Sequence, residues 1–92
     1  MADSWRASLM LGLMYIKLDR PKDAETCFRD AIANVEKLRL DPPPGRPYLM
    51  LAAARDIQGD EREARQMLQK AARCPDTREE ALERLREMDT PN

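Results

Sequence analysis

The sequence predicts an all-α protein of about five helices, arranged as antiparallel helical hairpins. Ala, Leu, Met, Glu, Lys, Arg and Gln dominate the composition whereas β-branched residues are scarce, and this balance favours helix over any long window. Apolar residues recur at spacings of three and four, as they do on one face of a helix. The three glycines and seven prolines fall mostly between these stretches, where they would separate the helices by short turns.

The first two expected helices are separated by the run LDRP at 18–21. The first helix should extend from about Ser4 or Trp5 to Leu18. The second should carry Pro21 in its first turn, where the missing N–H costs nothing. Its apolar stripe, which must pack against another element, consists of Ala24, Cys27, Phe28, Ala31, Ile32, Val35 and Leu38.

Three further helices are expected after the run DPPPG at 41–45, because consecutive prolines favour an extended segment. The third helix should begin near Pro47 and end at Gly59. Capping boxes are predicted at the starts of the fourth and fifth helices: Asp60 with Glu63, and Thr77 with Glu80. The fifth helix should present its apolar side through Ala81, Leu82, Leu85 and Met88.

Two stretches of the chain carry one pattern of small and large residues at a constant offset of 40 positions. The pattern consists of Leu11, Gly12, Ala24, Phe28 and Ala31 in the first stretch, and of Leu51, Ala52, Ala64, Leu68 and Ala71 in the second. Two antiparallel helices that cross closely need Gly or Ala at the contact point, with larger side chains around it. The sequence therefore predicts one helical hairpin used twice.

This pattern resembles the tetratricopeptide repeat, whose signature places Leu-Gly and Tyr in the first helix of a hairpin, and Ala and Phe four residues apart in the second. The resemblance is carried by Leu11-Gly12-x-x-Tyr15 with Ala24-x-x-x-Phe28, and by Tyr48-x-x-Leu51-Ala52 with Ala64-x-x-x-Leu68. It implies a short, right-handed α-solenoid in a single domain, 1–92. Repeat one would occupy about 5–40, a linker 41–46, repeat two about 47–75 and a capping helix about 77–89.

Three departures from the family pattern concern the stacking of the two units. Ser8 stands where the first unit should carry an aromatic residue, and Arg55 stands where the second should carry Tyr. The period is 40 rather than about 34 residues, and the surplus lies between Ala31 and Tyr48. The surplus lengthens the second helix and its exit, so the usual angle between units need not apply.

The side-chain inventory argues against an enzyme and against a cofactor, metal or nucleic-acid site. The chain has no His, the commonest general base and metal ligand. Cys27 is expected in the core, and Cys74 is expected to be partly exposed but inert. A net charge of -1 and an aromatic content of 4% give no reason to expect a nucleic-acid partner. The glutamates and arginines of the fifth helix are expected to form a solvated face.

The expected location is cytoplasmic, without a membrane partner. The apolar run from Leu9 to Ile16 is far shorter than the roughly 20 residues that span a bilayer, and no basic leader precedes it. Two cysteines are too few for a disulfide scaffold, which favours a reducing compartment.

The family resemblance implies a function in protein binding, because first helices of stacked units line a concave groove for peptides or partner helices. Carried over residue by residue, that groove would be lined by Arg6, Leu9, Leu13, Ile16, Lys17, Arg46, Leu49, Ala53, Asp56 and Ile57. Leu9 and Leu13 occupy the places where the family's carboxylate-binding clamp would begin. The sequence thus predicts an adaptor or chaperone-like module that binds a helical or apolar segment of a partner protein, and not an acidic tail.

The first helix independently favours an apolar partner, because its middle has no polar face. A helix that is hydrophobic all round is normally covered all round, and Met10 and Met14 would suit an adaptable surface. One alternative is that this helix is the core of a five-helix bundle. Another is that the chain is a structural homo-oligomer or part of a longer repeat array, in which the helix makes a subunit or inter-repeat contact.

Overall fold

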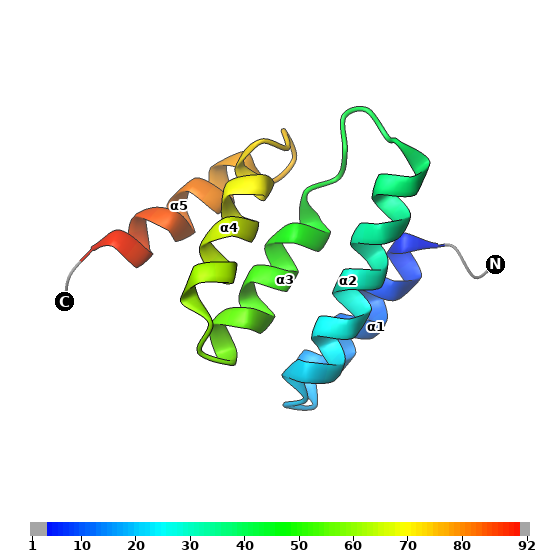
Figure 1. The fold of residues 1–92 in the computed structure, drawn as a ribbon, viewed down its shortest axis with the longest axis horizontal. Helices are drawn as coiled ribbons and strands as arrows, with labels where there is room; N and C mark the ends of the chain where they lie inside the picture. Colours follow the sequence, from blue (N-terminus) through cyan, green and yellow to red (C-terminus); the bar gives the residue numbers. More distant parts are fainter. Residues whose placement is uncertain (1–3, 91–92) are drawn as a thin grey trace.

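A computed structural model describes residues 4–90, which form five α-helices and no strand. The helices are α1 (Trp5–Lys17), α2 (Pro21–Leu38), α3 (Arg46–Ile57), α4 (Glu61–Ala72) and α5 (Arg78–Asp89). Helices α1 to α4 form two antiparallel hairpins that lie side by side, and α5 packs on α4 at the end of the row (Figure 1). The prediction of an all-α fold of stacked hairpins is confirmed.

The turns inside the two hairpins have the same hydrogen bonds, displaced by 40 residues. The Asp19 N–H donates to the Ile16 carbonyl at 3.0 Å, and the Gly59 N–H donates to the Asp56 carbonyl at 2.9 Å. The donating residue has a positive φ in both turns, 60° at Asp19 and 88° at Gly59. Three further pairs of bonds repeat at the same offset, each from the N–H of the first residue to the carbonyl of the second. They are Leu18 to Met14 with Gln58 to Ala54, Arg20 to Tyr15 with Asp60 to Arg55, and Ala24 to Arg20 with Ala64 to Asp60.

The crossing of α1 and α2 requires glycine at position 12, because the ring of Phe28 occupies the space beside it. A Cβ atom added to Gly12 would lie 2.7 Å from Cδ1 of Phe28 and still closer to Cε1. Phe28 and its neighbour Ala24 have no exposed surface. A well-packed core cannot accept such an overlap without moving the helices apart.

The second hairpin packs against the first through α3. Leu51 and Ala54 are 1% and 0% exposed, and they share one core cluster with Leu9, Ala24 and Phe28 of the first hairpin. Complete burial of one leucine side chain contributes about 1.5–3 kcal/mol. The two hairpins therefore depend on each other for a substantial part of their buried surface.

An ion-pair network centred on Arg55 also joins the hairpins. Its guanidinium donates from Nη1 to Oε1 of Glu25 on α2 at 3.0 Å, and from Nη2 to Oδ2 of Asp60 at 2.6 Å. Nε of Arg55 lies 2.8 Å from Oε1 of Glu63, an ion pair without hydrogen-bond alignment. Arg29 pairs with both Glu25 and Glu63, at 2.7 and 2.9 Å. Arginine replaces the tyrosine of the family pattern at a point where carboxylates from both hairpins converge.

The network keeps two of its carboxyl groups ionised. Burial raises the pKa of Glu25, but a hydrogen bond from Arg29 and the charges of Arg29 and Arg55 bring it below its usual value of 4.5. The pKa of Asp60 is lowered from 3.8, first by the hydrogen bond from the Glu63 N–H and then by the one from Arg55. Both side chains are therefore charged at neutral pH.

The linker between the hairpins is docked on the turn that joins α4 and α5. The Gly45 N–H donates to the two carboxylate oxygens of Asp76 at 3.0 and 3.3 Å. A Cβ atom on Gly45 would overlap Oγ1 of Thr77 and lie 2.7 Å from Cβ of Cys74. The end of the linker, at Gly45, is thus packed on this turn and holds the start of α5, whereas residues 38–43 are exposed.

The two predicted capping boxes differ from expectation. Asp60 does cap α4 by accepting from the Glu63 N–H at 3.0 Å, but the Glu63 carboxylate pairs with arginines instead of returning the bond. The prediction for α5 is wrong, because the Thr77 hydroxyl makes no cap and donates to the Ala71 carbonyl at 2.8 Å. Thr77 is 1% exposed, so its hydroxyl satisfies a buried carbonyl at the end of α4.

Candidate protein-binding surfaces

Four of the predicted groove residues contribute mainly to the core. Leu49 is fully buried, and Leu9 is 9% exposed. Leu13 and Ile16 are half-buried against the cluster that contains Leu9. Leu49 therefore offers no surface to a partner, because its side of α3 packs on α4 residues such as Leu68.

The three basic residues of the predicted groove have different surroundings. The guanidinium of Arg6 stacks on the Trp5 ring at 4.6 Å, and both residues line a cavity of about 560 Å³ beside the linker prolines. Lys17 is exposed at the last turn of α1. Arg46, at the start of α3, pairs with Glu80 of α5 at 3.4 Å.

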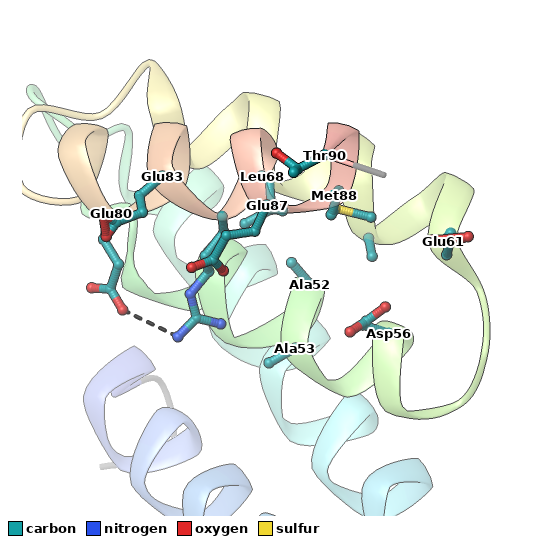
Figure 2. A pocket seen from close by; sticks show the side chains of 12 residues that line it. Ala52, Ala53, Asp56, Glu61, Leu68, Glu80, Glu83, Glu87, Met88 and Thr90 are labelled. Carbon is teal, nitrogen blue, oxygen red and sulfur yellow. Dashed lines mark hydrogen bonds and ion pairs between the residues drawn. The ribbon is translucent and has the colours of Figure 1, made fainter. Parts of the chain in front are cut away.

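Ile57, at the end of α3, is 57% exposed, and the last two members, Ala53 and Asp56, line a cleft of about 640 Å³ bounded by α3, α4 and α5 (Figure 2). We call it the acidic cleft. Its lining residues are Ala52, Ala53, Asp56, Glu61, Ala64, Leu68, Glu80, Glu83, Arg84, Glu87, Met88 and Thr90. Small and apolar side chains come from α3, α4 and the end of α5, whereas the charged side chains come mostly from α5.

Negative charge predominates around the acidic cleft. Five lining residues are carboxylates and one is Arg84, which pairs with Glu80 at 3.2 Å. Spacings of three and four place Glu80, Glu83 and Glu87 on the same side of α5. The arrangement favours cationic groups over anionic ones.

The glutamates of α5 are exposed, as expected for a solvated face. Three of them, Glu80, Glu83 and Glu87, also line the cleft, which reasoning from the sequence did not predict. Their spacing was a usable signal, because a capping helix that follows the second repeat must pack beside that repeat.

A second candidate surface is the side of α1 that points away from the core. Met10, Leu11 and Met14 are 62%, 47% and 58% exposed, and Leu18 just after the helix is 64% exposed. We call these four residues the outer face of α1. They are half of the eight large hydrophobic residues that are exposed in the described part of the chain. Apolar side chains gathered in this way usually mark an interaction site.

Neither thiol is placed for chemistry. Cys74 is 3% exposed beneath the docked linker, which corrects the expectation of partial exposure. Burial, and then the charge of nearby aspartates, raises the pKa of both Cys27 and Cys74, so neither is an activated nucleophile.

Among residues 4–90, no three His, Cys, Asp or Glu side chains are grouped to hold a metal ion. No helix in the same range combines the length and apolar content needed to cross a membrane.

Two stacked hairpins with repeated packing and turns define a helical-repeat protein. The family model of the tetratricopeptide repeat matches residues 5–75, a span that includes both hairpins. The chain belongs to the tetratricopeptide-repeat family, as its sequence pattern predicts. Comparisons with curated proteins and with solved structures gave no match. Repeats of this family generally serve as protein–protein interaction modules and are typically non-catalytic.

Proposed function

We propose that the chain is a non-catalytic adaptor that holds a segment of a partner protein in the acidic cleft. The observation that carries the proposal is an apolar floor beneath an acidic rim, next to the helix α3 on which the family's groove is expected. The preferred segment is amphipathic, with apolar side chains for the floor and Lys or Arg for the rim. A cytoplasmic location remains a prediction from the cysteine content.

The floor of the cleft suits an apolar side chain. Ala52, Ala64 and Leu68 are 2%, 1% and 4% exposed and close the core beneath the cleft, and the two small alanine side chains leave room above it. Met88, at the edge, is half-buried, and its flexible thioether can adapt to the occupant. A volume of about 640 Å³ is suited to a few side chains of a peptide rather than to a whole domain.

The rim determines which segments bind. Glu83 and Glu87 are exposed, so each ion pair with a partner contributes little to affinity on its own. Several carboxylates together nevertheless accelerate association with a basic segment and disfavour an acidic one. This preference agrees with the sequence prediction that an acidic tail is not the ligand.

The proposal is tested with two designed helical peptides of about 15 residues that share one Leu stripe and differ only in Lys or Glu at the polar positions. Calorimetry should show that the Lys peptide binds the wild-type chain at least about tenfold more tightly than it binds the Glu83→Gln/Glu87→Gln variant. In NMR titrations, the shifted amides should lie in α3, α4 and α5, the three helices that bound the cleft.

Two further variants separate the cleft from general surface charge. Glu79→Gln makes the same change on α5 outside the cleft lining and should leave affinity unchanged. Ala53→Phe fills the cleft without altering charge and should weaken binding. Equal affinity of the wild type and the Glu83→Gln/Glu87→Gln variant, or amide shifts only outside α3, α4 and α5, would show that the proposal is wrong.

A further inference from the structure

From the internal repeat, we infer that the outer face of α1 is a second docking surface. Its occupant is an amphipathic helix of a partner protein, antiparallel to α1, with carboxylates beside its apolar stripe. The inference is independent of the acidic cleft, because the two surfaces share no residue.

The second hairpin shows what the equivalent face does when it is covered. The residues 40 positions after Leu11 and Met14 are Leu51 and Ala54. These two are 1% and 0% exposed in the core cluster with the first hairpin, whereas Leu11 and Met14 are 47% and 58% exposed. Among the described helices, α1 packs mainly on α2 and also contacts α3, and both lie on its other side. The same face of the first helix is thus a stacking surface in the second repeat and an open surface in the first repeat.

The two ends of the stack differ in a way that supports a covered α1. A repeat that ends a stack normally has a polar outer side for solubility. At the far end, α5 largely meets this requirement, since Glu79 and Arg86 are exposed outside the cleft lining and Leu82 is its one exposed large apolar residue. At the near end, the outer face of α1 presents Met and Leu side chains instead. The difference indicates that α1 is suited to a partner rather than to solvent.

The charges that flank the outer face favour an acidic occupant. Arg6 and Lys17 are the charged residues of α1, and both are exposed. Spacings of four and three place them on the same side of the helix as Met10 and Met14. A partner helix with carboxylates beside its apolar stripe would pair with both.

The interface between α2 and α3 shows how a covering helix can supply carboxylates to the helix beneath it. There the covering helix α2 is antiparallel to α3 and supplies the acceptors. Glu25 of α2 accepts from Arg55 at 3.0 Å near one end. Glu36 of α2 accepts from the Tyr48 hydroxyl at 3.3 Å near the other end. Arg55 and Tyr48 correspond to Tyr15 and Ser8, so a helix on the outer face of α1 would share the antiparallel arrangement but would meet Arg6 and Lys17 as its donors.

A second copy of the chain fits this face less well. In a two-fold antiparallel pairing of α1 with itself, Arg6 of one copy would lie opposite Lys17 of the other, and like charges repel. The apolar stripe of α2, including Phe28, is already covered inside each copy. The structure therefore favours an occupant other than a second copy of the chain.

The test is an NMR titration of the full chain with two helical peptides of about 15 residues that share a Leu stripe and carry either Glu or Lys at the flanks. The Glu-flanked peptide should shift amides of residues 5–18 and bind there at least about tenfold more tightly than the Lys-flanked one. Met14→Glu should abolish these shifts. Leu82→Glu introduces the same charge at an apolar residue of α5 that is 41% exposed, and it should preserve them.

Separate outcomes distinguish this inference from the proposed function. The Glu83→Gln/Glu87→Gln variant should bind the Glu-flanked peptide at α1 as the wild type does, whether or not the acidic cleft binds anything. Sedimentation equilibrium of the chain alone should give a monomer. The inference is overturned by a dimer that Met14→Glu dissociates, by equal affinity for the two peptides at α1, or by an absence of shifts in residues 5–18.

Discussion

The two hairpins share a turn geometry and a crossing point but differ in the residues that form them. At the crossing, the first hairpin combines Gly12 with Phe28, and the second combines Ala52 with Leu68. A larger residue on one helix is thus matched by a smaller one on the other. The repeat determines where two helices meet, and each hairpin fills the contact with its own pair of side chains.

The turns of the two hairpins also differ in which pair of side chains makes contact. In the first hairpin, the Arg20 guanidinium lies 5.3 Å from the centre of the Tyr15 ring. At the equivalent positions of the second, Arg55 pairs with Asp60 at 2.6 Å. A cation–π contact in one turn corresponds to an ion pair in the other. Arg55 therefore departs from the family pattern together with its neighbour, and its charge links the hairpins through Glu25.

The largest difference between the hairpins should appear when one leucine is truncated in each. Leu51→Ala removes a side chain that is 1% exposed and should lower the free energy of unfolding by about 2–5 kcal/mol. Leu11→Ala, at the equivalent position, removes one that is 47% exposed and should cost less than about 1 kcal/mol. Urea unfolding followed by circular dichroism measures both. Equal losses would mean that the outer face of α1 is covered in solution.

A smaller effect should follow when the crossing of the first hairpin is given the residues of the second. Gly12→Ala should lower the free energy of unfolding by about 1–2 kcal/mol, because overlap with the Phe28 ring outweighs the helix propensity gained. Adding Phe28→Leu should recover part of that loss. A double-mutant cycle in urea measures the coupling, and additive losses would contradict this explanation of Gly12.

The crossing residues could be predicted from the sequence because they depend on spacing within one hairpin. The surface residues could not, because they depend on how hairpins and cap dock. Leu49 was predicted at the groove, but the packing of α3 on α4 buries it. The glutamates of α5 reach the acidic cleft because Gly45 and Thr77 hold the start of that helix. The 40-residue period did not indicate that Gly45, at the end of the linker, would pack on the turn between α4 and α5.

The turns should respond to substitution more weakly than the crossing. Gly59 has a φ of 88°, and no atom lies within 4 Å of an added Cβ, so Gly59→Ala tests backbone strain alone. It should cost about 1 kcal/mol. Asp19→Gly, at the equivalent position with a φ of 60°, should instead raise the free energy of unfolding by less than about 1 kcal/mol. Thermal unfolding of the two variants measures the contrast, and a loss in both would contradict it.

The smallest expected effect concerns the charged link between the hairpins, and it depends on pH. Because the pKa values of Glu25 and Asp60 are lowered in the folded chain, both stabilise it above their usual pKa values of 4.5 and 3.8. This stabilisation is lost as pH falls through the lowered values. Arg55→Met removes one of the charges that lower the pKa values of Glu25 and Asp60. The variant should therefore be slightly less stable than the wild type at pH 7 and lose less stability on acidification.

Urea unfolding at a series of pH values from neutral to acid measures this difference. Arg73→Met is the matched control, because Arg73 is exposed and lies outside the network formed by Arg55, Glu25 and Asp60. Its stability should follow the wild-type curve. The effect of Arg55→Met should also shrink in high salt, since the ion pairs are partly exposed. If the Arg55→Met and wild-type curves run parallel down to acid pH, Arg55 does not couple the hairpins through charge, and its packing alone accounts for its place in the second repeat.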